Sequence, residues 1–201
     1  ESGIEKITHF DASNYPSRIA AEVKEFSPEA YIEGKELKKL DPFVQYAIAA
    51  SVMAMNNAGL RLPAAHAERT GVLIGCGMGG LSSLEQQHTI LLEKGSRRVS
   101  PFTIPMLIPN MAAGHVSIYT GARGPNSCVT TACAAGSHAI GDAFKLIQRG
   151  AADVMITGGT EAAITPLGLA GFSNMKALST QNDFPARASR PFDRDRDGFV
   201  M

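Results

Sequence analysis

Three short apolar segments alternate with helix-length amphipathic segments through the middle of the chain, and this alternation limits the folds open to it. The apolar segments are TGVLIG (70–75), SCVTTA (127–132) and DVMITGG (153–159). Each is short and contains β-branched residues, which is typical of buried strands. Strand, helix and strand in this order predict parallel strands joined by right-handed crossovers. We therefore expect an α/β protein in which helices cover a sheet.

The first of the predicted helices has a clear start and end. Asp41-Pro42 predicts a helix N-terminus, because aspartate accepts from free N–H groups and proline suits the first helical position. Val44, Met55 and the apolar residues between them then keep one face, and Gly59 is a typical stop.

Two further helices are expected over 81–94 and 135–149. The second is amphipathic, and its apolar residues at helical spacing are Ala139, Ile140, Ala143, Phe144 and Ile147. Residues 95–110 hold three prolines, so we expect an ordered loop there with a short helix following.

The composition is that of a soluble globular protein, with 44% apolar and 19% charged residues. A chain of 201 residues can form one large domain or two small ones. Lys plus Arg and Asp plus Glu number 19 each, so the overall charge argues neither for nor against a polyanionic partner. We expect no nucleic-acid partner.

The sequence also bears on location. No apolar run is long enough to cross a bilayer, and the N-terminus lacks the pattern of a signal peptide. The three cysteines, Cys76, Cys128 and Cys133, are an odd and sparse set that fits a reducing compartment. We therefore expect a cytoplasmic protein without a membrane partner. The end at DRDGFVM, directly after an apolar pair, is interpreted as a cut through a longer protein.

Two motifs imitate ligand sites. GCGMGG (75–80) fits the dinucleotide pattern G-x-G-x-x-G, but no second strand with an acidic residue follows at the required distance. We interpret its glycines as sites of close backbone packing and special dihedral angles. DRDRDG (193–198) resembles the start of a calcium loop without its helix or final glutamate, and mutual neutralisation of opposite charges is the better interpretation.

The histidines and cysteines show no metal-ligand spacing. His138 lies near Cys133 in sequence, but five residues along a helix turn the two side chains to different sides. We expect His138 and His115 to be structural.

Cys133 lies where a predicted strand ends and a predicted helix begins, among small residues. Free N–H groups of a helix's first turn favour a thiolate and can hold a developing oxyanion. This arrangement is typical of a nucleophile elbow. A buried structural cysteine is an equally good interpretation of the residues alone, and Cys128, within the strand, fits that role.

Four blocks of the sequence resemble the β-ketoacyl-[acyl-carrier-protein] synthases, most closely the synthase II type of bacterial fatty acid elongation. The blocks are RVSPFTIPMLIPNMAAGHVS (98–117), GPNSCVTTACAAGSHAIGDA (124–143), GAADVMITGGTEAAITPLGLAGF (150–172) and KALSTQNDFPARASRPFDRDRDGFV (176–200). They follow the order and spacing of the family over nearly the whole chain.

The resemblance implies a thiolase-like layered α/β/α sandwich. Residues 1–201 would be the N-terminal of its two duplicated halves, without the first strand, and the C-terminal half would be absent. In the family that other half carries two histidines and a lysine of the active site, so we expect this chain to be inactive alone.

The reaction implied is decarboxylative Claisen condensation of acyl carrier protein (ACP) thioesters. The catalytic residue would be Cys133, which takes an acyl group from acyl-ACP and passes it to the carbanion from malonyl-ACP. Loss of carbon dioxide drives the step, so no nucleotide, metal or redox cofactor is expected.

Other functions share the fold. They are a polyketide ketosynthase, synthase I, a thiolase acting on coenzyme A esters, and a non-catalytic dimerisation or ACP-binding module. A chain-length factor, which lacks the nucleophile, is disfavoured by Cys133.

The resemblance also assigns positions beyond the nucleophile. The acyl-pocket residues would be Met78, Ile104, Gly168 and Phe172, with Ile104 reaching the partner's pocket in a homodimer joined through NSCVTTA (126–132). The ACP-docking residues would be Lys35, Lys38, Lys39, Arg97 and Arg98.

Overall fold

The computed structural model describes residues 2–61 and 64–201. The chain forms two compact units. One is Ser27–Ala162, and the other combines residues 2–26 with 163–201. Each unit has its own cluster of buried apolar residues.

The sheet of the first unit has the predicted parallel strands. β3 (Thr70–Gly75) lies between β4 (Asn126–Val129) and β5 (Val154–Gly159), and both neighbours run parallel to it. β3 and β5 match the predicted segments closely. The predicted strand 127–132 is shorter at its end, because the backbone leaves the extended region at Thr131 and Ala132 to enter the next helix.

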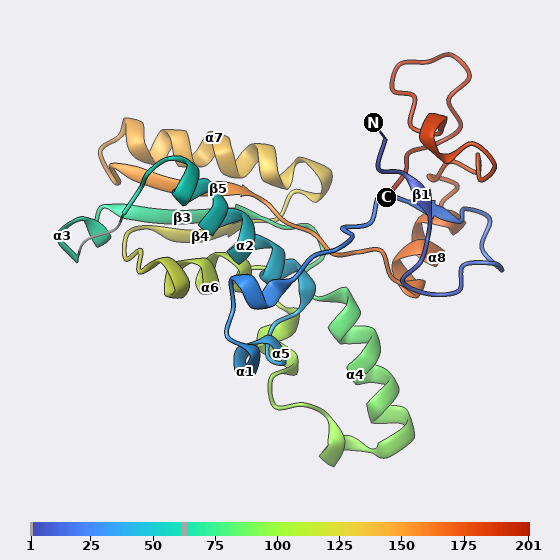
Figure 1. Ribbon diagram of the computed structural model, residues 1–201, viewed down its shortest axis with the longest axis horizontal. Helices are drawn as coiled ribbons and strands as arrows, with labels where there is room; N and C mark the ends of the chain where they lie inside the picture. Colours follow the sequence, from blue (N-terminus) through green and yellow to red (C-terminus); the bar gives the residue numbers. More distant parts are fainter. Residues whose placement is uncertain (1, 62–63) are drawn as a thin grey trace. The chain divides into compact units, whose positions relative to one another are not determined.

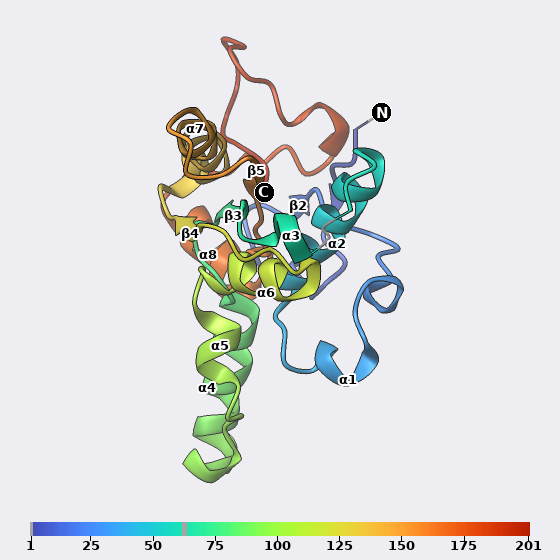
Figure 2. The ribbon, with the colours of Figure 1, turned by 90° about the vertical axis from the view of Figure 1, so that its left-hand side faces the viewer.

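Helices cover both faces of this sheet. α7 (Ala135–Gln148) lies on one face, and α2 (Pro42–Asn57) and α6 (Met111–Thr120) lie on the other (Figures 1 and 2). Val72 and Ile74 of β3 are buried against the α2 and α6 side. The first unit is therefore a three-layer α/β/α structure, as predicted.

The apolar residues predicted to form one face of α7 differ in their burial. Ala139 and Ala143 are fully buried, which lets the helix backbone approach the sheet closely. Ile140 and Phe144 are 54% and 59% exposed. Small side chains therefore face the sheet, and the large ones lie on the outer side of the helix.

The remaining helical segments of this unit are short except α4. They are η1 (Pro28–Ala30), α1 (Gly34–Leu37), α3 (Ala64–Ala67), α4 (Leu81–Lys94), η2 (Ser96–Arg98), α5 (Thr103–Leu107) and η3 (Ala132–Ala134). The stretch 95–110 thus contains two helical turns of its own, and α6 follows it.

Asp41 caps two helices. As predicted it begins α2, where its Oδ1 accepts from the N–H of Phe43 at 3.2 Å. Its Oδ2 accepts from the N–H and the hydroxyl of Ser83, at 3.0 and 2.7 Å, in the first turn of α4. The residue preceding α4 is Gly80, which has no side chain to serve as a cap. Asp41 therefore fixes the start of both helices.

The second unit is a small hairpin with one helix. β1 (Glu5–Lys6) pairs antiparallel with β2 (Ile19–Ala20), and the helical segments are α8 (Pro166–Asn174) and η4 (Pro185–Arg187). Ala12, Leu169 and Leu178 form the buried centre.

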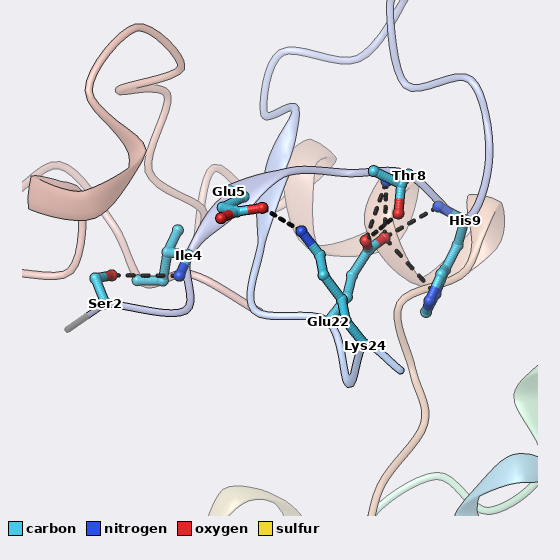
Figure 3. Close-up of polar contacts among 7 residues, drawn as sticks. All are labelled: Ser2, Ile4, Glu5, Thr8, His9, Glu22 and Lys24. Atoms are coloured by element: carbon cyan, nitrogen blue, oxygen red, sulfur yellow. Dashed lines mark hydrogen bonds and ion pairs between the residues drawn. The ribbon is translucent and has the colours of Figure 1, made fainter. Parts of the chain in front are cut away.

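A buried carboxylate ties this hairpin together (Figure 3). Glu22 has a side chain only 1% exposed, and it accepts from Thr8 N–H at 2.9 Å, Thr8 Oγ1 at 2.6 Å and His9 N–H at 3.1 Å. Burial acts to raise the pKa of Glu22, but these hydrogen bonds outweigh burial and leave the pKa below its usual value. The neighbouring pair Glu5 and Lys24 lies on the surface.

Candidate active site

Cys133 is an exposed free thiol between β4 and α7. It lies in the single turn η3, and the residue before it, Ala132, has φ +50°. Positive φ is uncommon for residues other than glycine, and such strained positions concentrate at functional sites. The sequence prediction of a strand-to-helix turn at this position is therefore confirmed, and the turn is sharp.

Close glycine contacts bring the start of α7 onto the ends of the strands. A Cβ placed on Gly75 would come within 2.2 Å of the backbone of Ala135, and one on Gly136 within 3.3 Å of Gly159. At Gly75 only hydrogen fits, and at Gly136 a side chain would be tight. The first turn of α7 thus lies over the carboxyl ends of β3 and β5, and the positive end of its helix dipole, which favours negative charge, lies at this edge of the sheet.

The segment Cys76–Gly80, here called the glycine loop, leads from β3 to α4. A Cβ on Gly80 would lie 2.0 Å from the carbonyl oxygen of Met106, and one on Gly79, which has φ +71°, 2.2 Å from that of Leu107. The interpretation of these glycines as sites of close packing and special dihedral angles is confirmed. Met78 is exposed on this loop, and Ile104 is exposed on α5.

The glycine loop lies beside the turn that carries Cys133. A Cβ on Gly77 would lie 3.7 Å from the carbonyl oxygen and 3.8 Å from the Cα of Ala132, the residue before Cys133. The loop that carries Met78 and the turn that carries the thiol therefore lie side by side.

Glu161 is a residue of this site that the sequence analysis missed. Its Oε2 accepts from Gly77 N–H at 2.7 Å and from Met78 N–H at 3.1 Å. The thiol of Cys76 lies 3.6 Å from its Oε1. One feature of the sequence could have indicated its place in the site. Glu161 follows closely after a predicted parallel strand, and the carboxyl ends of parallel strands meet at one edge of the sheet.

The other two cysteines are less accessible than Cys133. Cys76 is buried, and burial together with the Glu161 carboxylate raises its pKa to about 12. Cys128 is half-buried and packs against the core. At neutral pH the Cys76 thiol is therefore protonated and enclosed.

The two histidines considered in the sequence analysis, His138 and His115, make a local contact or are partly buried. His138 Nδ1 lies 2.7 Å from the hydroxyl of Thr131, so the ring bonds to the turn that leads into its own helix. His115 on α6 is half-buried, and burial lowers its pKa. The expectation that His138 is satisfied locally is confirmed.

Two of the three predicted docking lysines make ion pairs. Lys35 pairs with Glu33 at 2.7 Å and Lys39 with Glu36 at 2.9 Å. Within the described residues no ion pair involves Lys38. The group is therefore less basic than the sequence alone indicated.

The two basic clusters lie on neighbouring segments. The ammonium of Lys39 stands 5.5 Å from the ring centre of Phe102, shortly after the exposed Arg97 and Arg98 of η2. Lys38 borders a polar pocket of about 460 Å³, whose other lining residues include Ser82, Gln86 and Ser100.

The last two predicted pocket residues belong to the second unit. Gly168 is buried in α8 and donates its N–H to Thr165 Oγ1 at 3.1 Å. Phe172 packs on the core of that unit, with its ring edge-on to Phe199 at 5.3 Å. Their membership of an acyl pocket stays a prediction.

The charged stretch DRDRDG (193–198) is engaged in contacts within the chain. Asp197 accepts from Ser179 Oγ at 2.7 Å and Thr180 N–H at 2.9 Å, and Arg194 pairs with Asp195.

In residues 2–61 and 64–201 no three His, Cys, Asp or Glu side chains gather as metal ligands would. The helices in the same ranges are all too short or too polar to cross a bilayer.

The chain is similar to known proteins over its full length. The family described as "Beta-ketoacyl synthase, N-terminal domain" matches residues 1–201. A 3-oxoacyl-[acyl-carrier-protein] synthase 2 from Synechocystis is 57% identical over 200 residues, which are all of this chain and 48% of that protein. The chain thus spans about half the length of the curated relatives it matches.

Solved structures agree. A β-ketoacyl synthase from Burkholderia phymatum matches with a TM-score of 0.83 and 29% identity, over 98% of this chain and 49% of that one. A type II polyketide ketosynthase, solved in complex with its acyl-carrier protein, matches with a TM-score of 0.71 and 26% identity over 78% of this chain and 46% of that one.

Proposed function

Because this chain belongs to the β-ketoacyl synthase family, as its N-terminal domain, we propose that the full-length protein condenses acyl-ACP with malonyl-ACP in fatty acid elongation. The observation that carries the proposal is the exposed Cys133 thiol at the strained turn before α7, inside a chain 57% identical to a synthase of this type. A polyketide ketosynthase is the second candidate. It is the weaker one, because the solved ketosynthase of that type is 26% identical to this chain over 78% of its length.

The first half-reaction is acyl transfer to Cys133. The sulfur attacks the thioester carbonyl of acyl-ACP, the carbonyl oxygen becomes an oxyanion, and the carrier thiol leaves as the carbonyl re-forms. Sulfur suits this exchange because a thiolate is both a strong nucleophile and a good leaving group. The positive end of the α7 dipole, which begins two residues after Cys133, favours the negative charge of this oxyanion.

The second half-reaction forms the carbon–carbon bond. Malonyl-ACP loses carbon dioxide, and the electron pair left on the α-carbon attacks the Cys133 thioester. The cysteine sulfur leaves with its electron pair, and the product is a 3-oxoacyl-ACP two carbons longer. The groups that stabilise the carbanion are expected outside residues 1–201.

Thiol labelling and substitution test the proposal in the full-length protein. Cys133→Ala should abolish both acyl transfer and condensation, and mass spectrometry should find the acyl group on the Cys133 peptide of the wild type. Cys128→Ala is the matched control, since that thiol is half-buried in the strand just before the turn, and it should keep most of the activity. Equal losses from the two substitutions would contradict the assignment.

A competition experiment separates the candidate classes. A synthase should use acyl-ACP in preference to the matching coenzyme A ester, whereas a thiolase should prefer the latter. A non-catalytic module should bind ACP without becoming acylated.

We also propose a homodimer. β4 is one of the two edge strands in the order β4-β3-β5, and its first two residues are exposed. An open strand edge invites pairing with another chain. Pairing of β4 with its copy would join two sheets around a two-fold axis. Light scattering on the full-length protein tests this, and a stable monomer at micromolar concentration would contradict it.

A further inference from the structure

Glu161 holds the glycine loop by its backbone. The Glu161 carboxylate accepts from two successive N–H groups, those of Gly77 and Met78, at 2.7 and 3.1 Å. The other two N–H groups of the loop that follow are also bonded, Gly79 to the Cys76 sulfur at 3.3 Å and Gly80 to the Leu107 carbonyl at 2.9 Å. A single side chain thus supplies the acceptor for the half of the loop that carries Met78.

The position of this carboxylate is fixed by the sheet. Glu161 comes two residues after the end of β5, and its neighbour Thr160 is held on two sides. The Thr160 N–H donates to the Gly75 carbonyl at 3.0 Å, and its hydroxyl donates to the Phe43 carbonyl at 2.6 Å. The backbone before Glu161 is therefore anchored both to β3 and to α2.

The loop needs such an anchor because its sequence is permissive. Glycines lose more conformational freedom on ordering than other residues, and three of the five loop residues are glycine. Hydrogen bonds to a charged acceptor are stronger than neutral ones. Gly77 in turn lies beside Ala132, the residue before Cys133, so the anchor also sets how the glycine loop lies against the Cys133 turn.

We propose that Glu161 is a positioning residue of the condensation reaction. By accepting from Gly77 and Met78 it holds the glycine loop against the Cys133 turn, and it thereby determines how Met78 selects acyl chains by length. This inference rests on the proposed function and concerns a residue that does not itself touch the reacting atoms.

The test is a double-mutant cycle in the full-length enzyme. The measured quantity is the ratio of kcat/KM for a long and a short acyl-ACP primer, here called the length ratio. Met78→Ala should change the length ratio of the wild type by roughly fivefold or more, and should change it less than about twofold in the Glu161→Ala background, because residues in one network couple on this scale. Glu161→Gln keeps one acceptor oxygen and should retain part of the coupling.

Asp153→Ala is the matched control. Asp153 is a carboxylate that immediately precedes β5 at its other end and pairs with Arg69 at 2.6 Å. Its loss should leave the length ratio and the effect of Met78→Ala unchanged. Thermal melting of every variant separates loss of folding from loss of positioning, and Glu161→Gln carries the test if Glu161→Ala does not fold.

The inference is overturned if Met78→Ala changes the length ratio equally in both backgrounds, or leaves it unchanged in the wild type. Either result would leave condensation by the wild type and its dependence on Cys133 intact. Failure of the proposed function differs, because the wild type would then extend neither primer.

Discussion

Removal of the Asp41 carboxylate should cost more stability than removal of an ordinary helix cap, because one side chain caps both α2 and α4. Asp41 is fully buried, and its two oxygens accept from Phe43 N–H and from the N–H and hydroxyl of Ser83. Gly80 offers no side chain as a substitute at the start of α4. Asp41→Ala should therefore free the ends of two helices at once.

The magnitude follows from the bonds that are lost. Each cap contributes about 1 kcal/mol, and the hydroxyl bond of Ser83 to a charged acceptor contributes about 1.5 kcal/mol or more. Burial raises the pKa of Asp41, so the carboxylate carries a desolvation cost that its removal returns. We expect Asp41→Ala to lower the free energy of unfolding by about 3 kcal/mol.

Urea unfolding of the full-length protein, followed by circular dichroism at one fixed protein concentration, measures this loss. Thr165→Ala is the single-cap control, since Thr165 is also buried and caps α8 alone through Gly168. Its loss should be about 1 kcal/mol. Ser83→Ala should be similarly mild, because Asp41 then keeps both backbone bonds. If Asp41→Ala costs no more than Thr165→Ala, the double-cap reasoning is wrong.

Three further predictions concern selectivity, pH and docking. Met78→Phe in the full-length enzyme should reduce kcat/KM for long acyl primers more than for short ones, because a rigid ring replaces a flexible side chain, and a uniform loss would contradict a role of Met78 in selecting chain length. The depressed pKa of Glu22 means that its stabilisation is present above the unfolded value of about 4.3 and is lost as the pH falls through the lower folded value. Urea midpoints of Glu22→Gln should therefore be lower than wild type at pH 7 and fall less steeply below about pH 4.5, whereas Glu5→Gln on the surface should behave like wild type. Lys38→Glu should raise the KM for acyl-ACP, weaken its salt dependence and spare a small carrier-free thioester, while Lys145→Glu on α7 should change none of these if docking uses the predicted face.

The elements whose limits depend on local chemistry were predictable from the sequence. Asp41-Pro42 begins α2, and TGVLIG coincides with β3, because capping residues, proline and short apolar runs act within a few residues. The end of β4 was not predictable in this way. Thr130 and Thr131 favour extended backbone. The chain nevertheless has to turn here, because the start of α7 packs closely on Gly75 and Gly159.

Contacts between distant segments account for what the sequence analysis missed at the site. The bond from Gly77 to Glu161 spans 84 residues, and no local pattern marks it. The ion pairs of Lys35 and Lys39 with nearby glutamates are local contacts. A prediction that counts only the lysines therefore overestimates the positive charge of this cluster.

The glycine loop resembles a dinucleotide loop for a physical reason. In a dinucleotide site, glycines allow the backbone N–H groups to approach a phosphate after a strand. Here the same backbone freedom is used within the chain, because the N–H groups of Gly77 and Met78 point at the Glu161 carboxylate. An anion from the protein itself therefore occupies the place where a phosphate would bind. The glycines that resemble a cofactor motif instead let Glu161, which follows β5, hold the glycine loop beside the Cys133 turn.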